Sequence, residues 1–151
     1  MELGIIERDI HVEASPAVVF DVISRPEHMQ EWWPDEARFE PVPGAAGEVA
    51  WRSDDGKAMT VALTLVEVDP PRRFSFRWCF EEPDRRGPSL LVTFDLTPSG
   101  TGTHVRMTES GFREMGWEVA RLEEQYREHA TAWDHFVPAL GAYAERQVAS
   151  R

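Results

Sequence analysis

The longest regular pattern in the chain is a stripe of apolar residues between positions 117 and 148. After Trp117 they recur every three or four positions: Leu122, Tyr126, Ala130, Trp133, Val137, Leu140 and Tyr143. This spacing predicts one helix with a buried face, about 45 Å long at 1.5 Å per residue. Pro138 removes one backbone hydrogen bond, yet the stripe continues through it, so we predict a kinked helix rather than two helices.

Near the N-terminus the pattern is that of a strand followed by two short helices. Residues 3–13 alternate between polar and apolar in their second half, as a half-buried strand does. Ser15 and Pro16 are favoured at an N-cap and a first helical position, and this helix is expected to end at Pro26. A second short helix is expected over 27–33.

Six strand-like segments follow, separated by turn signals such as Asp54-Asp55-Gly56: residues 38–42, 48–52, 58–68, 73–80, 89–96 and 104–112. Short strands joined by tight turns predict an antiparallel, meandering sheet. The apolar phase slips after Leu65, which indicates a bulge. Only the C-terminal helix is long enough to cover the apolar face. We therefore predict a single α+β domain over 1–151.

The charge balance of the chain bears on its partners. It has 27 acidic and 16 basic residues, for a net charge of −11, which argues against binding to nucleic acid or to an anionic membrane surface. Its lone cysteine, Cys79, cannot form an internal disulfide, and no apolar run is long enough to span a bilayer. These features favour a cytoplasmic protein.

No sequence motif indicates a catalytic centre or a metal site. The five histidines lack metal-ligand spacing and are predicted at the surface or at sheet edges. Gly100-Thr101-Gly102 is interpreted as a hairpin turn rather than a phosphate cradle. Alternation places Cys79 on the side away from the neighbouring aromatic residues. We expect no metal, no cofactor and no catalytic residue.

Several segments together resemble one family. They are Ala14-Ser15-Pro16 before Val19-Phe20, Pro26-Glu27-His28 with Trp32-Trp33-Pro34, Val68 to Phe74 ending in Trp78, and Thr108 to Phe112 before a tryptophan-bearing helix. The order resembles bacterial proteins related to the C-terminal domain of the activator of Hsp90 ATPase, of the START-like or Bet v 1-like (SRPBCC) superfamily. The resemblance covers about residues 5–145. The family usually has glycine where this chain has Ala132, before Trp133.

The resemblance implies a helix-grip fold. In this fold a curved seven-stranded antiparallel sheet surrounds a long C-terminal helix, with two short helices after the first strand. A cavity for an apolar small molecule commonly lies between sheet and helix. The family shares no catalytic residues that could be transferred to this chain.

This arrangement places the first strand beside the last strand. Alternation then puts Arg8 and Glu109 on the inner face. Because a buried carboxylate needs a partner, we predict a salt bridge between them. The pair either orients a polar group of a ligand or satisfies its own two charges.

The cavity lining is predicted from the inward positions. Beside Arg8 and Glu109 it comprises nine residues: Trp33, Trp51, Met59, Phe76, Trp78, Phe94, Met107, Trp133 and Val137. Such residues line apolar ligand pockets. The alternative is that they pack on one another as a solid core.

Three functions remain open. The first is binding of an apolar or aromatic small molecule, without defined chemistry. The second is an enzyme of the polyketide cyclase or aromatase type that uses the same cavity. The third is a chaperone-interacting module, ranked last because the eukaryotic cochaperones carry an N-terminal domain that we do not find here. A homodimer could form through an edge strand or the outer helix face.

Overall fold

The computed structural model describes residues 4–149. Its elements follow the predicted order: β1 (Ile5–Val12), α1 (Pro16–Ser24), α2 (Pro26–Met29), β2 (Glu36–Arg38), β3 (Ala46–Arg52), β4 (Ala58–Asp69), β5 (Arg73–Trp78), β6 (Leu90–Ser99), β7 (Gly102–Ser110), the 3-10 turn η1 (Arg113–Met115) and α3 (Val119–Ala149).

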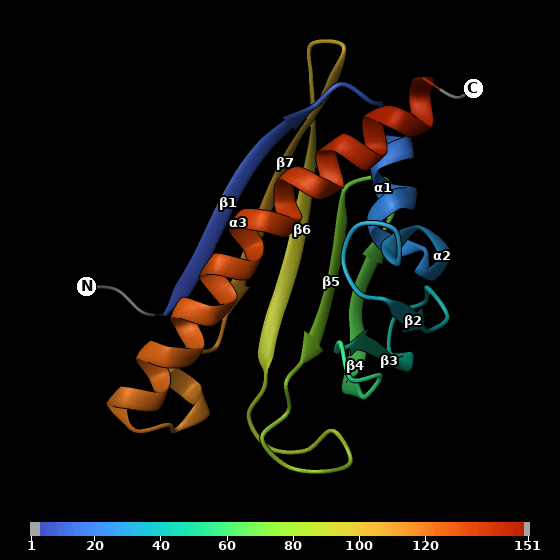
Figure 1. Cartoon of the computed structure of the whole chain (residues 1–151). Coiled ribbons are helices and arrows are strands. Elements are labelled where there is room, and N and C mark those ends of the chain that lie inside the picture. Colours follow the sequence, from blue (N-terminus) through green and yellow to red (C-terminus); the bar gives the residue numbers. More distant parts are fainter. Residues whose placement is uncertain (1–3, 150–151) are drawn as a thin grey trace.

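The seven strands form one antiparallel sheet in the order β1-β7-β6-β5-β4-β3-β2 (Figure 1). The first strand therefore pairs with the last, as the resemblance implied, and the α+β helix-grip architecture is confirmed. The register between β4 and β5 shifts between Leu65 and Glu67, which confirms the predicted bulge. Burial alternates along β6 from Leu90 to Leu96 and along β7 from Thr103 to Glu109, so one face of these strands belongs to the core.

Local capping explains where the first helix begins. The Ser15 hydroxyl accepts a hydrogen bond from the Val18 amide at 3.2 Å, which satisfies one of the free donors at the helix start. The second helix is shorter than predicted, because the chain leaves it after Met29 for a turn. In this turn the Trp32 indole donates to the carbonyl of Val22 at 3.0 Å, which links the turn to α1.

The C-terminal helix α3 is continuous from Val119 to Ala149 and includes Pro138, so the prediction of one helix is confirmed. Pro138 lies on its exposed side, and the bend there stays a prediction. At Gly141 the helix comes close to β1, since a Cβ atom would lie 2.8 Å from Ile10 Cδ1. Most contacts of α3 with the sheet are made with β1 (Figure 1).

This off-centre placement positions the site. The helix packs closely over β1 at one side of the curved sheet, and its C-terminal part packs on α1. Strands β3 and β4 lie at the other side, so the inner face between them and α3 must be filled by large side chains or stay open. Both outcomes occur here.

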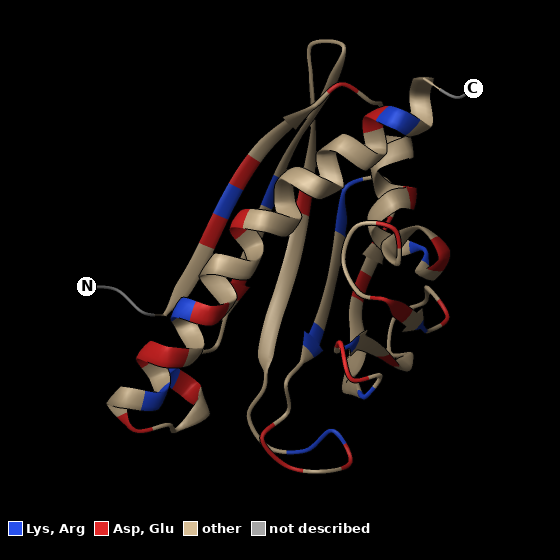
Figure 2. Cartoon of the chain, in the orientation of Figure 1, with Lys and Arg blue, Asp and Glu red and all other residues tan. Residues whose placement is uncertain are grey.

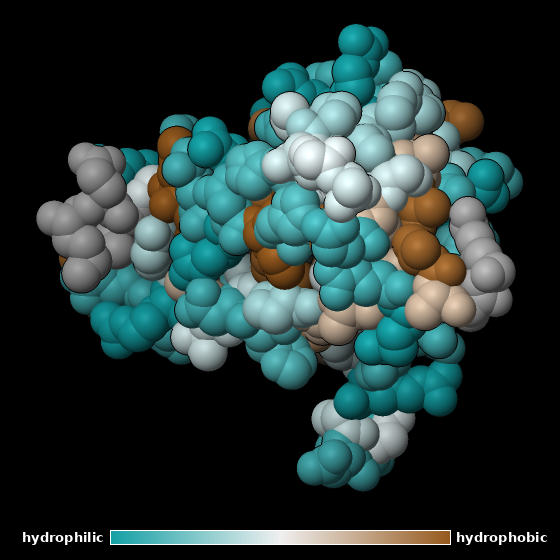
Figure 3. Space-filling model, turned by 90° about the horizontal axis from the view of Figure 1, so that it is seen from above, coloured by the Kyte–Doolittle hydropathy of each residue, from teal (hydrophilic) through white to brown (hydrophobic). Residues whose placement is uncertain are grey.

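Charged residues of both signs are scattered over the surface (Figure 2), and several form ion pairs, such as Arg38 with Glu48 at 2.6 Å. Seen from above, hydrophobic residues reach the surface only in separate small areas (Figure 3). Among the described residues, no helix has the length and apolar character that crossing a membrane requires.

Candidate ligand pocket

A pocket of about 490 Å³ opens between α3 and the strands β3, β4 and β5. Four of the chain's six tryptophans contribute to it. Its wall is formed by Trp33, Trp51, Met59, Val61, Trp78, Cys79, Gln125, Glu128, His129, Ala132, Trp133 and Phe136. Its size and mainly apolar wall are those of small-molecule sites.

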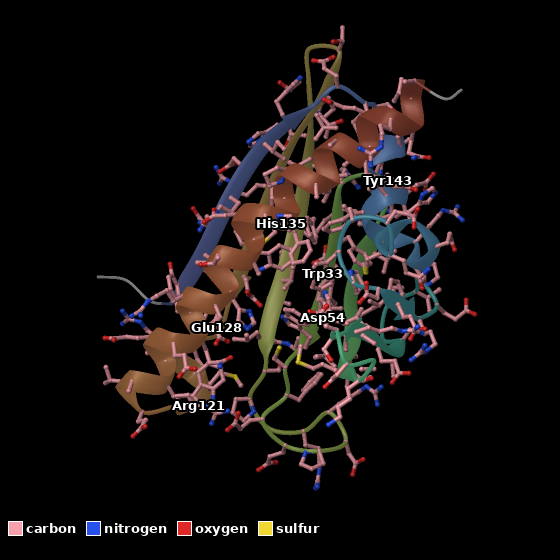
Figure 4. The ribbon with its side chains drawn as sticks, viewed as in Figure 1. Trp33, Asp54, Arg121, Glu128, His135 and Tyr143 are labelled. Atoms are coloured by element: carbon pink, nitrogen blue, oxygen red, sulfur yellow. The ribbon has the colours of Figure 1, made fainter. Side chains whose placement is uncertain are left out.

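Trp33 is the central residue of the aromatic wall (Figure 4). Its ring centroid lies 5.3 Å from that of Trp133, in a stacked arrangement, and 5.0 Å from that of Trp78. It also meets the rings of Trp51 and Phe76 edge-on or tilted. These rings form a rigid surface, because each is held by several neighbours.

A fully buried carboxyl group lies directly behind this wall. Glu109 of β7 has 0% of its surface exposed. The Trp78 indole donates to its Oε2 at 2.7 Å, and the Trp133 indole donates to its Oε1 at 2.9 Å. His129 Nδ1 lies 2.9 Å from the same Oε1. The two indole donors and the imidazole nitrogen replace the water that the carboxyl group lost on burial.

The predicted ion pair of Arg8 with Glu109 is wrong. Arg8 does lie on the helix side of β1, but its Nε is 2.7 Å from Asp134 Oδ1 of α3. In the register of β1 and β7, Arg8 is opposite Met107, whereas Ile6 is opposite Glu109. Arg8 is therefore displaced two residues along the sheet and meets the exposed flank of the helix, outside the pocket.

His129 is the partner that the sequence reasoning missed. It was predicted at the surface or an edge; instead only 15% of its side chain is exposed. Its ring lies between those of Trp78 and Phe112, at centroid distances of 5.7 and 5.5 Å. A signal was present, because His129 lies four residues before Trp133 and thus on the same helix face.

The second imidazole nitrogen of His129 remains accessible. Among the described residues, no hydrogen bond to Nε2 occurs, and no fully buried side-chain nitrogen or oxygen lacks a partner. Nε2 must therefore have surface of its own, and His129 belongs to the pocket wall. The pocket wall thus includes an imidazole whose Nδ1 is paired with Glu109 and whose Nε2 has no hydrogen-bond partner among the described residues.

Cys79 also departs from its predicted place. Strand β5 ends at Trp78, and Cys79 has a φ of 54°, a left-handed conformation that interrupts the alternation. Its side chain belongs to the pocket wall instead of the outer face. Burial raises the pKa of its thiol, and the Glu109 carboxylate raises this pKa further.

Cys79 is therefore expected to react slowly with iodoacetamide at pH 8, at least about tenfold more slowly than in urea, where the thiol regains a pKa of about 8.5. Because the pKa of the thiol is higher in the folded than in the unfolded protein, its contribution to the free energy of unfolding is fully present below about pH 8.5. This contribution decreases as the pH rises above that value. Mass spectrometry of the alkylated protein gives both rates, since the chain has one cysteine. Equal rates in buffer and urea would contradict the buried placement.

The structure separates the predicted lining into two groups. Trp33, Trp51, Met59, Trp78 and Trp133 form part of the pocket wall. The other apolar members pack behind it as solid core and are at most 4% exposed: Phe76, Phe94, Met107 and Val137. Five of the nine predicted residues thus contribute to the pocket wall, and four are buried in the core.

The first turns of α3 border the pocket. Gln125 and Glu128 belong to its wall, and Figure 4 shows Glu128 on α3. Farther toward the helix start, Glu81 of the β5–β6 loop accepts from the Trp117 indole at 3.1 Å and from Arg121 at 3.2 Å. These two hydrogen bonds connect the start of α3 to the β5–β6 loop, beyond one end of the pocket.

A larger hollow of about 750 Å³ lies on the outer face of the sheet, where Arg77, Arg85 and Ser89 contribute to it. Its only aromatic wall residue is Phe80, so it lacks the cluster of rings that lines the smaller pocket. Within residues 4–149, no group of three His, Cys, Asp or Glu side chains is placed to hold a metal ion.

Comparison with solved structures finds the same fold. Protein NE0264 from Nitrosomonas europaea has a TM-score of 0.79 at 14% identity, and the match covers 99% of each chain. The Aha1 dimer from Colwellia psychrerythraea has a TM-score of 0.71 at 17% identity, covering 93% of this chain and 96% of that one. DynU16, a putative protein in the dynemicin biosynthetic locus, has a TM-score of 0.68 at 22% identity, covering 94% of this chain and 47% of its own.

No functionally curated protein matches the chain. The family model described as "Activator of Hsp90 ATPase homolog 1-like protein" matches residues 13–145. This match includes every strand but β1, both short helices and most of α3. The chain therefore belongs to the family of activator of Hsp90 ATPase homolog 1-like proteins, within the START-like superfamily.

Proposed function

We propose that this protein binds an apolar or aromatic small molecule in the pocket between α3 and the β3–β5 side of the sheet. One observation carries the proposal: four tryptophans, a phenylalanine and a methionine surround an open volume of about 490 Å³. An aromatic ligand would bury its faces against rings that are already fixed, so little ordering entropy is lost on binding.

The exposure of Met59 adds to this proposal. Its side chain belongs to the pocket wall and is 62% exposed, whereas methionine gains free energy when it is covered. A ligand in the pocket would cover it. The flexible thioether can adapt to ligands of different outline.

The test uses N-phenyl-1-naphthylamine, a neutral aromatic probe whose fluorescence rises in apolar surroundings. We expect one saturable site, with quenching of tryptophan fluorescence over the same concentration range. Replacing Ala132 by leucine extends a side chain from α3 into the pocket, and it should weaken binding at least about tenfold, which is about 1.4 kcal/mol.

Ala142→Leu is the matched control, because Ala142 lies on an exposed face of the same helix and outside the pocket. It should bind the probe like the unmodified protein. If Ala132→Leu binds the probe as tightly as Ala142→Leu does, the probe occupies another place and the proposal fails.

A second candidate is an enzyme of the polyketide cyclase or aromatase type. What supports it is the Glu109–His129 pair at the pocket, since a carboxyl-held imidazole can accept or donate a proton. The two candidates differ in a simple readout. A binding protein returns its ligand with unchanged chromatographic retention and mass after incubation, whereas an enzyme returns a product whose retention differs, even where cyclisation leaves the mass the same.

A further inference from the structure

We infer that the pocket selects aromatic molecules that carry a weakly acidic hydroxyl group, a phenol or an enol, and that His129 Nε2 is the atom that binds this hydroxyl. The inference rests on the proposed function and specifies its ligand class. Glu109 acts as a positioning residue, because its carboxyl group holds the imidazole at Nδ1 and does not itself line the pocket.

The first step concerns which nitrogen is available. Glu109 Oε1 lies 2.9 Å from His129 Nδ1, so this nitrogen is already bound. The rings of Trp78 and Phe112 meet the imidazole nearly edge-on, with interplanar angles of 68° and 89°. The ring is thereby fixed in two directions, and Nε2 remains for a ligand.

The second step concerns the ligand atom. When the imidazole is neutral and its proton is on Nδ1, Nε2 is an acceptor and needs a donor from the ligand. With the imidazole protonated, Nε2 is a donor and needs an acceptor. A phenol or enol oxygen satisfies both states, because it can donate its own proton or accept the imidazolium proton as an oxyanion. An ether or a hydrocarbon cannot donate.

The third step excludes more strongly acidic ligands. A carboxylate or sulfonate would bring a full negative charge to a chain of net charge −11. It would lie close to the buried Glu109 carboxyl group and to Glu128 of the pocket wall. A weak acid arrives neutral and avoids this repulsion.

The test compares 2-naphthol with 2-methoxynaphthalene, which has the same rings but no hydroxyl proton. Isothermal titration should show 2-naphthol bound about tenfold more tightly by the unmodified protein. Equal affinities would overturn the inference and leave the proposed function standing. Binding of neither compound would overturn both.

His129→Asn isolates the role of Nε2. The asparagine amide nitrogen can take the place of Nδ1 beside Glu109, but nothing replaces Nε2. The preference for 2-naphthol over 2-methoxynaphthalene should disappear in this variant, so that the ratio of the two affinities falls to about one. His135→Asn, on an exposed position of the same helix, is the control and should keep the preference.

A measurement on the unmodified protein covers the case in which His129→Asn does not fold. The ¹⁵N resonance of His129 Nε2 should shift on addition of 2-naphthol and stay in place with saturating 2-methoxynaphthalene. A preference for 2-naphthol that persists in folded His129→Asn, or an Nε2 resonance that does not move, would refute the assignment of the hydroxyl to His129.

Discussion

Replacing Glu109 by alanine is expected to lower the free energy of unfolding by about 3–5 kcal/mol. The carboxyl group accepts hydrogen bonds from both indoles and lies against His129 Nδ1. Without it the two buried indole N–H groups lose their acceptor, and each such loss costs about 1–3 kcal/mol. Loss of the acceptor beside the imidazole adds a smaller amount, since water can reach His129 through the pocket. Urea unfolding followed by far-ultraviolet circular dichroism measures the loss.

Two further variants give this result its meaning. Glu109→Gln keeps one acceptor oxygen but turns an NH₂ group toward N–H donors. Its free energy of unfolding should therefore lie between those of the unmodified protein and Glu109→Ala, about 1–3 kcal/mol below the former. Glu124→Ala, at an exposed position of α3, should change stability by no more than about 0.5 kcal/mol. A loss below 1 kcal/mol for Glu109→Ala would show that the three contacts do not hold the carboxyl group as described.

The fold could be predicted because its signals are local. The alternation in β5 places Phe74, Phe76 and Trp78 on one face, and the structure buries all three. The phase slip after Leu65 appears as a register shift, and Ser15 caps α1. Each of these depends on residues a few positions apart, whose spacing is visible in the chain.

The partner of Glu109 could not be predicted in the same way. Alternation correctly placed Glu109 inward, and it also placed Arg8 on the helix side of β1. Which groups meet them depends on where α3 lies along the sheet. At Gly141 the helix packs closely against Ile10, and in this position it brings Asp134 to Arg8 and His129 to Glu109. A helix shifted by one turn would have produced other pairs from the same pattern.

Cys79 shows a second limit of periodicity. The alternating pattern of β5 continues through Phe80, but the backbone at Cys79 adopts a φ of 54°. No neighbouring glycine or asparagine announces this left-handed residue, and such conformations in other residues are uncommon. Strain of this kind concentrates at functional sites, which agrees with the place of Cys79 in the pocket wall.

Replacing Trp33 by alanine is expected to lower the free energy of unfolding by about 3–5 kcal/mol and to abolish binding of N-phenyl-1-naphthylamine. Trp33 is 6% exposed, and its ring meets those of Trp51, Trp78 and Trp133. Removing it takes away the surface on which Trp133 stacks and opens the pocket toward the core. Chemical denaturation and probe titration measure the two effects separately.

Trp117→Ala is the matched control, because Trp117 is half-buried beyond the end of the pocket and donates to Glu81. Its loss removes one hydrogen bond and the stacking of Arg121 on the indole at 4.9 Å, worth about 1–2 kcal/mol together. Probe affinity should stay unchanged. Equal losses of stability in both variants would show that Trp33 does not hold the aromatic wall together as described. If Trp33→Ala still bound the probe, the aromatic wall would not be the binding surface. Only a selective effect of Trp33 ties the stability of the wall and the binding of an aromatic ligand to the same side chain.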